Sequence, residues 1–78
     1  MTATAHPDRH EHAASIGAAV RTTREGLRLD QETTALLAGV STRFLRALEH
    51  GKPTVQLDKL LAVLDVLGLE LRIGRRGA

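Results

Sequence analysis

The chain of 78 residues contains no cysteine, tryptophan or tyrosine, one phenylalanine and only two prolines. Without cysteine it can form neither a disulfide bond nor a zinc site with thiolate ligands. With so few aromatic residues, its core must be built from aliphatic side chains, mainly leucine, valine and alanine. A chain of this length makes one small domain that buries a modest fraction of its surface, so we expect dimerisation to add stability.

Long apolar runs are also missing. A membrane-spanning helix needs about 20 apolar residues in succession, and the segment LLAVLDVLGLEL is interrupted by Asp65 and Glu70. The first residues do not show the basic and then apolar pattern of a secretory signal. We therefore expect a cytoplasmic protein that does not contact the membrane.

The residue types that catalysis requires are scarce. Only two serines are present, and no glycine-rich phosphate loop or carboxylate pair is evident. His6, His10 and His12 are irregularly spaced without a cluster of other metal-binding residues, so a polar tail is favoured over a metal site. We predict no enzymatic activity, no metal and no cofactor.

The formal net charge of the chain is +2, which permits DNA binding but does not by itself indicate it.

Apolar periodicity predicts four helices between residues 15 and 68, preceded by a disordered arm over residues 1–14. The first helix is expected to start at Ser15 and to end at Gly26. Asp30 and Gly39 bound the second helix. Ser41 starts the third, which is terminated by Gly51 and Pro53, and the leucines of the fourth end at Gly68. The tight connection at Gly39-Val40-Ser41 predicts a helix-turn-helix unit.

After the fourth helix the period changes to two. Leu69, Leu71 and Ile73 alternate with charged residues, which is typical of a half-buried strand over residues 69–73. One strand finds no partner in this chain, so we predict that it pairs across a homodimer and that residues 74–78 form a flexible tail. The predicted fold class is all-α, with four helices and a short C-terminal β-strand.

The sequence resembles the Cro/repressor-type (XRE) helix-turn-helix family over residues 16–73. The motif residues are Leu29, Gln31, Gly39-Val40-Ser41, Leu45, Leu48-Glu49 and Gly51-Lys52. The chain is most similar to the HipB branch of this family, whose members are antitoxins of HipA-type serine/threonine kinases. The features that carry this similarity are the short length of the chain and the segments FLRALEHGKP and LGLEL. The resemblance implies a DNA-binding autorepressor that recognises a palindromic operator and binds such a kinase.

The family's third helix lies in the DNA major groove. By resemblance, the residues of this helix that face DNA are Thr42, Arg43, Phe44, Arg46 and Ala47. Arg43 is favoured as a base-reading residue over a solvated one because of its place in the motif, and arginine can pair with guanine through two hydrogen bonds. Phe44 contacts either a thymine methyl group or the core, and Arg46 is either a phosphate contact or a solvated side chain.

The resemblance also assigns supporting roles. Gln31, at the start of the second helix, matches a family glutamine that donates to a DNA phosphate. Ser41 is first an N-cap and second a phosphate contact. His50 and Lys52 match positions that follow the DNA backbone, and Lys52 is favoured because it is always charged. The family's conserved glutamate pairs with an arginine of the first helix, which implies an Arg24–Glu49 ion pair.

Four residues depart from the family pattern. Thr34 replaces a leucine, and its hydroxyl is expected to bond to the carbonyl four residues earlier. Arg28 replaces a common glycine, so the turn there is expected to differ. Leu36 and Leu37 occur where polar residues are usual.

Two other functions stay open: a stand-alone XRE-type regulator without a toxin, and a protein-interaction module that does not bind DNA.

Overall fold

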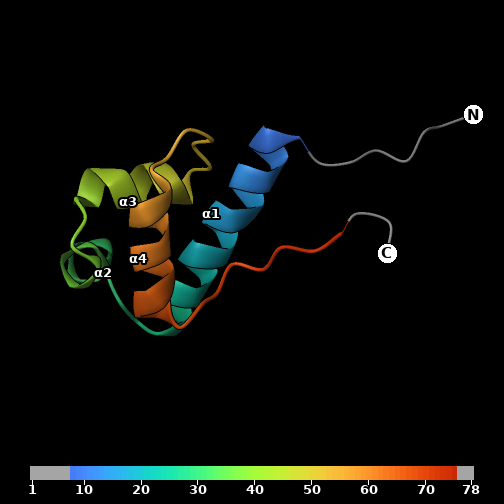
Figure 1. Cartoon of the computed structure of the whole chain (residues 1–78). Coiled ribbons are helices and arrows are strands. Elements are labelled where there is room, and N and C mark those ends of the chain that lie inside the picture. Colours follow the sequence, from blue (N-terminus) through green and yellow to red (C-terminus); the bar gives the residue numbers. More distant parts are fainter. Residues whose placement is uncertain (1–7, 76–78) are drawn as a thin grey trace, which may run out of the picture.

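The computed structural model describes residues 8–75, and this part contains four α-helices and no β-strand. The helices are α1 (Arg9–Gly26), α2 (Gln31–Ala38), α3 (Thr42–Glu49) and α4 (Leu57–Leu67), and Figure 1 shows α1 and α4 beside each other with α2 and α3 packed against them. The four predicted helices are therefore confirmed. None of the helices in this part is long and apolar enough to cross a membrane.

The core lies where all four helices meet. It consists of aliphatic side chains, as the composition required: Val20, Ala35, Leu45, Leu48, Leu60, Val63, Leu64 and Leu67. Each fully buried valine or leucine contributes about 1.5–3 kcal/mol to folding. Two of these leucines, Leu45 and Leu48, belong to α3, so the same core that stabilises the domain also fixes the second helix of the helix-turn-helix unit.

The prediction for the start of α1 was wrong. The helix begins at Arg9, so residues 9–14 are helical, and Ser15 lies within the helix. The N-cap is Asp8, whose side chain accepts a hydrogen bond of 2.9 Å from the backbone N–H of Glu11. Asp8 and Glu11 have the spacing of a capping box, and this signal could have located the helix start. Residues 1–7, which include His6, lie outside the described residues.

The caps of α2 and α3 match the predictions. The Asp30 side chain accepts a 2.7 Å hydrogen bond from the Thr33 N–H, and the Ser41 hydroxyl oxygen accepts one of 2.9 Å from the Phe44 N–H. Gly39 ends α2 in the left-handed conformation, with φ of 71°. This conformation favours glycine and turns the chain directly into α3.

Gly17 brings α1 unusually close to α3. A Cβ atom at this position would clash with the backbone carbonyl oxygen of Leu48 and would lie 3.0 Å from that of Glu49. Only a residue without a side chain allows the two backbones to approach this far. The sequence does not predict this requirement, because nothing in the spacing of residues indicates a contact between two backbones.

Two departures from the family pattern have structural consequences. The buried Thr34 hydroxyl donates a hydrogen bond of 2.9 Å to the carbonyl oxygen of Asp30, as predicted. Arg28 has a φ of 60°, in the left-handed region that glycine adopts at lower cost. The turn between α1 and α2 therefore carries backbone strain that glycine would relieve.

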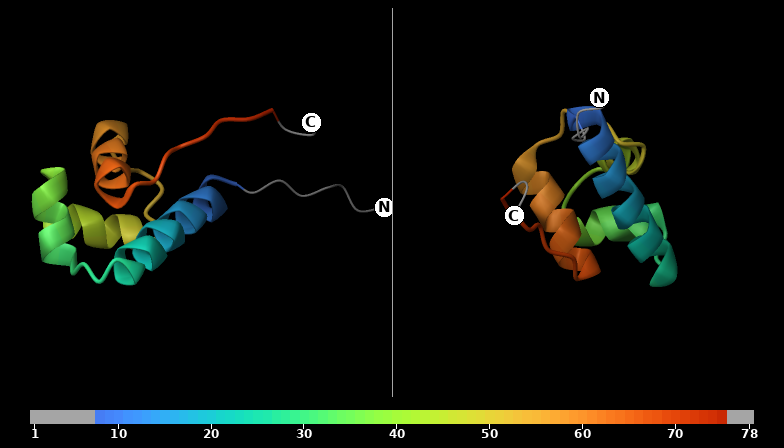
Figure 2. Two further views of the ribbon diagram at one scale, coloured as in Figure 1. Left: turned by 90° about the horizontal axis from the view of Figure 1, so that it is seen from below. Right: turned by 90° about the vertical axis from the view of Figure 1, so that its right-hand side faces the viewer.

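The C-terminal segment, defined here as residues 69–75, has no regular secondary structure. Leu69 packs against the core, whereas Leu71 and Ile73 are exposed. The segment leaves the end of α4 and extends away from the helices (Figure 2). The expected strand over residues 69–73 is not formed within the described part, and its pairing with a second chain remains a prediction.

Candidate nucleic-acid interface

The helix α3 has one buried and one open side. Leu45 and Leu48 face the core, while Arg43 and Arg46 are exposed and Ala47 is half-buried. Thr42, at the start of the helix, is also half-buried. The structure thus places the predicted base-reading residues on the side of α3 that the core leaves open.

Phe44 lies where the core meets the open side of α3. It is half-buried and packs against the core cluster. The Lys59 ammonium nitrogen lies 5.8 Å from the centre of its ring, within the range of a cation–π interaction. This contact joins α4 to α3 and places a lysine beside the outer side of α3. Lys59 carries no sequence signal that predicts this position.

A hollow of about 300 Å³ adjoins the outer side of α3. Its lining comes from α3, from the following loop and from the start of α4, and its charged residues are Arg43, Lys52 and Lys59. All three are cationic, so this surface attracts an anionic polymer. Figure 1 shows that the α3–α4 loop lies next to α3, which explains how residues distant in sequence form one surface.

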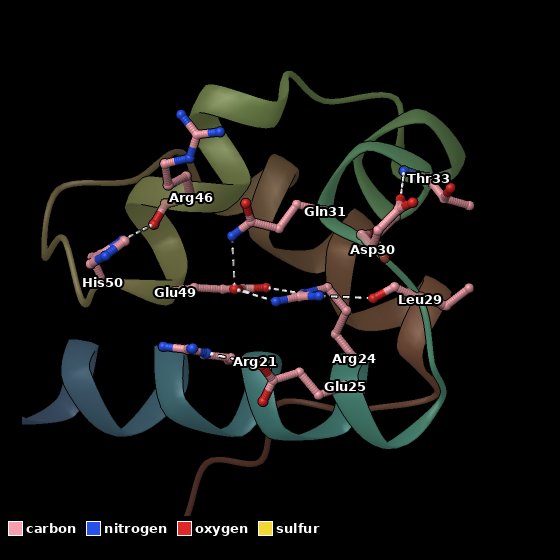
Figure 3. A network of polar contacts seen from close by, with 11 residues as sticks. Arg21, Arg24, Glu25, Leu29, Asp30, Gln31, Thr33, Arg46, Glu49 and His50 are labelled. Atoms are coloured by element: carbon pink, nitrogen blue, oxygen red, sulfur yellow. Dashed lines mark hydrogen bonds and ion pairs between the residues drawn. The ribbon is translucent and has the colours of Figure 1, made fainter.

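Arg24 and Glu49 form the ion pair that the resemblance implied. Arg24 Nε donates to Glu49 Oε2 over 2.6 Å, and the second guanidinium nitrogen donates to Oε1 over 3.0 Å. The two side chains are only 10% and 2% exposed. The third guanidinium nitrogen donates to the Leu29 carbonyl over 2.8 Å, so the pair also holds the turn that leads to α2 (Figure 3).

The pair shifts the pKa values of both groups. The hydrogen bond with Glu49 raises the pKa of Arg24 above its usual value. Burial alone would raise the pKa of Glu49, but hydrogen bonds from Arg24 and Gln31 and the charge of Arg24 outweigh burial and lower it. Glu49 therefore stays ionised beside the core, where an unpaired carboxylate would be costly.

Gln31 does more than the resemblance implied. Its side-chain amide donates to Glu49 Oε1 over 3.1 Å, so α1, α2 and α3 meet at one carboxylate (Figure 3). Gln31, Arg46 and His50 also line a polar hollow of about 310 Å³ beside Arg21. The imidazole Nδ1 of His50 lies 2.7 Å from the Arg46 carbonyl oxygen. Three of the predicted phosphate-facing or DNA-facing residues are thus brought together at the edge of α3.

Ser41 and Lys52 lie on the other side of α3. Ser41 is exposed, but its hydroxyl already accepts the capping hydrogen bond of α3. Lys52 is exposed just after the helix. The two hollows together therefore border the outer side of α3 along both of its edges, and most of the predicted DNA-binding residues line one or the other.

The fold and this surface are those of a helix-turn-helix protein, and the chain belongs to that family: residues 20–73 match its XRE-type family profile. The chain is also 48% identical over 60 residues to the uncharacterized HTH-type transcriptional regulator y4mF of Sinorhizobium fredii (strain NBRC 101917 / NGR234). This match covers 77% of the chain and 79% of y4mF. The protein is therefore a transcriptional regulator with a helix-turn-helix DNA-binding domain.

Proposed function

We propose that the protein is a dimeric repressor that reads a palindromic operator with the open side of α3. The observation that carries this proposal is the way α3 is held. Leu45 and Leu48 fix the helix to the core, and Glu49 is clamped by Arg24. A recognition helix with one orientation presents its side chains to the major groove in one register.

Arg43 is the principal base-reading residue in this proposal. It is exposed, and no ion pair occupies its guanidinium in residues 8–75. A bidentate pair with guanine O6 and N7 is worth about 1–3 kcal/mol of discrimination. Thr42 and Ala47 complete the reading surface, because a small side chain at position 47 allows close approach to the groove.

The phosphate contacts flank this reading surface. The first turn of α2 begins at Gln31 and has free backbone N–H groups that can bind one phosphate. His50 and Arg46 lie at the same edge of α3, and Ser41, Lys52 and the newly found Lys59 lie at the other. These contacts position the protein on DNA, whereas Arg43 supplies the sequence preference.

Selection of bound sequences from random DNA tests the proposal. The wild-type protein is expected to enrich a palindrome with half-sites about 34 Å apart. Arg43→Ala should keep its fold and most of its non-specific, salt-dependent affinity for DNA, but it should lose the preference at one base pair of each half-site. Arg9→Ala, which removes an exposed arginine at the start of α1, is the matched control and should select the wild-type sequence.

Retention of the full sequence preference by Arg43→Ala would contradict this assignment of the base-reading residue. Absence of any enriched sequence with the wild-type protein would favour the alternative of an interaction module that does not bind DNA.

A narrower role follows from the resemblance to the HipB branch: a cytoplasmic antitoxin that represses its own operon and binds a HipA-type kinase. Leu36 and Leu37 support a protein partner, because both are large apolar residues exposed on α2. Purification of the tagged protein from nuclease-treated host lysate tests this role. Recovery of a kinase in equal amounts supports the antitoxin, whereas recovery of the protein alone, from a lysate that contains the neighbouring kinase, favours a stand-alone regulator.

A further inference from the structure

The loop between α3 and α4 borders a third hollow, of about 290 Å³, which also contacts the first turns of α1 and the start of α4. Figure 1 shows these first turns beside the loop. The two approach closely, since a Cβ atom at Gly51 of the loop would lie 3.0 Å from the Cα atom of Ala14. We call this hollow the α1–loop pocket. Its main apolar residues are Ile16, Leu48, Val55 and Leu60, and its charged residues are Arg9 and Lys52.

The interior of the α1–loop pocket is apolar. Leu48 and Leu60 are core residues, and Ile16 and Val55 are half-buried and pack against the same core. An apolar hollow with a few polar groups at its edge is the usual form of a site for a small molecule. At about 30 Å³ for each, the share of liquid volume that one water molecule takes, the pocket holds about ten non-hydrogen atoms.

The charges that line the α1–loop pocket are all positive. Arg9 and Lys52 are exposed, and neither takes part in an ion pair within residues 8–75. His12 lines the same edge, and its ring can donate an N–H, whereas none of the described lining residues is acidic. A ligand that carries one carboxylate would therefore receive charge-assisted hydrogen bonds at this edge.

The first turns of α1 form one side of the α1–loop pocket. Arg9, His12, Ala13 and Ile16 are spaced by three or four residues, so they lie on one side of the helix. Ile16 packs against the core, but Arg9 and His12 are exposed. The helical turns before Ile16 thus add a wall and a positive rim to the pocket.

Lys52 links the α1–loop pocket to the DNA-facing surface. Its side chain lines both this pocket and the hollow beside Arg43. One ammonium group cannot bind a carboxylate in the pocket and a DNA phosphate on the other surface at the same time. A bound carboxylate therefore competes with DNA for Lys52, and DNA weakens binding of the carboxylate by the same factor.

We propose that the α1–loop pocket binds a small amphipathic carboxylate and that this ligand weakens operator binding by holding Lys52. The apolar tail of the ligand lies on Leu48 and Leu60, and its carboxylate meets Arg9 and Lys52. The effect on the operator rests on the function proposed above, whereas binding of the ligand does not.

Titration with octanoate, followed by NMR, tests the site without DNA. The chain has two isoleucines, Ile16 in the pocket and Ile73, which is 94% exposed on the C-terminal segment. In protein isotope-labelled at the isoleucine methyl groups, octanoate should shift the Ile16 signal to saturation and leave that of Ile73 in place. Octanamide, which has the same size and no charge, should bind about tenfold more weakly. Acetate, which has no tail, should shift neither signal at the same concentration.

Two substitutions on α1 test the location of the site. Ala13→Leu puts a larger side chain into the pocket and should abolish octanoate binding. Ala18→Leu is the matched control, because Ala18 is exposed on another side of the same helix, and it should bind octanoate like the wild-type protein. Circular dichroism verifies that both variants are folded. Equal binding by the two variants would show that octanoate binds elsewhere.

Binding of the selected operator, measured with and without octanoate, tests the effect on DNA. Saturating octanoate should weaken operator binding about tenfold and lower the slope of log K against log salt by about 1, since one phosphate contact is lost. In Lys52→Met, octanoate should leave operator binding unchanged.

Three further results would overturn the proposal: equal shifts of the Ile16 and Ile73 signals, equal affinity for octanoate and octanamide, or operator binding that saturating octanoate does not change. The NMR titration contains no DNA. A failed ligand site is therefore distinguishable from a failed DNA-binding function.

Discussion

Arg24 and Glu49 are 25 residues apart in sequence and join α1 to α3 through two hydrogen bonds of 2.6 and 3.0 Å. Both side chains are buried, so neither charge is well solvated if its partner is removed. The ion pair therefore fixes the orientation of α3 at the end that follows the proposed base-reading residues.

Removal of one partner of this pair should destabilise the domain strongly. We expect Arg24→Ala to lower the free energy of unfolding by about 3–5 kcal/mol, because it leaves the Glu49 charge buried and unpaired. The double variant Arg24→Met with Glu49→Leu should lose much less. Urea unfolding of the single and double variants measures the difference, and equal losses would show that the buried charge is not the cause.

The stability of the domain should depend on acid pH through Glu49. Its pKa is lower in the folded protein than the ordinary value of about 4.3, so between these two pKa values the unfolded chain binds more protons. The stabilisation is complete above the ordinary pKa and is lost as the pH falls through the lower, folded-state value.

Urea unfolding between pH 3 and pH 7 measures this dependence. In Glu49→Gln part of the acid dependence should disappear, while the part due to Asp30 remains, because the hydrogen bond from the Thr33 N–H lowers the pKa of Asp30 as well. An unchanged pH profile in Glu49→Gln would contradict the prediction.

Gly17 should not tolerate a side chain. Gly17→Ala places a methyl group against the α3 backbone, and we expect a loss of about 1–3 kcal/mol in the free energy of unfolding, as for other overpacked sites. Gly26→Ala is the matched control in the same helix, because no atom outside its chain neighbours and its own helical backbone lies within 4 Å of the added Cβ. Thermal and urea unfolding should show a large loss for the first variant and none for the second.

Lys59 should contribute to DNA affinity without contributing to sequence preference. Replacing it with methionine removes one charge from the surface beside α3. Binding to the selected operator should weaken, and the slope of log K against log salt should fall by about 1. Arg9→Met, which removes one exposed positive charge at the start of α1, is the charge-matched control and should leave the salt slope unchanged. An unchanged salt slope in Lys59→Met would show that Lys59 does not contact a phosphate.

The sequence predicted the parts of the fold that depend on local chemistry. The caps at Asp30 and Ser41, and the turn at Gly39, require particular side chains at particular positions, and all three occur as expected. The Arg24–Glu49 pair was available only through the family resemblance, since its members lie in different helices.

Other features could not be predicted in the same way. The first turns of α1 carry no apolar stripe, so only the Asp8 cap marks where the helix begins. The roles of Gly17 and Lys59 depend on which helix lies opposite, and spacing within one segment gives no information on that. Gln31 was assigned to DNA alone because its contact with Glu49 likewise crosses between helices.

The helix α3 has one side that packs against the rest of the domain and one open side, and this separation bears on how the proposed preference for a DNA sequence can change. The residues that hold the helix, Leu45, Leu48 and Glu49, are distinct from Thr42, Arg43 and Ala47, which face outward. Substitutions at the outward positions leave the core and the ion pair intact. Under the proposed function, exchanging these three side chains changes the operator preference while the rest of the domain keeps its structure.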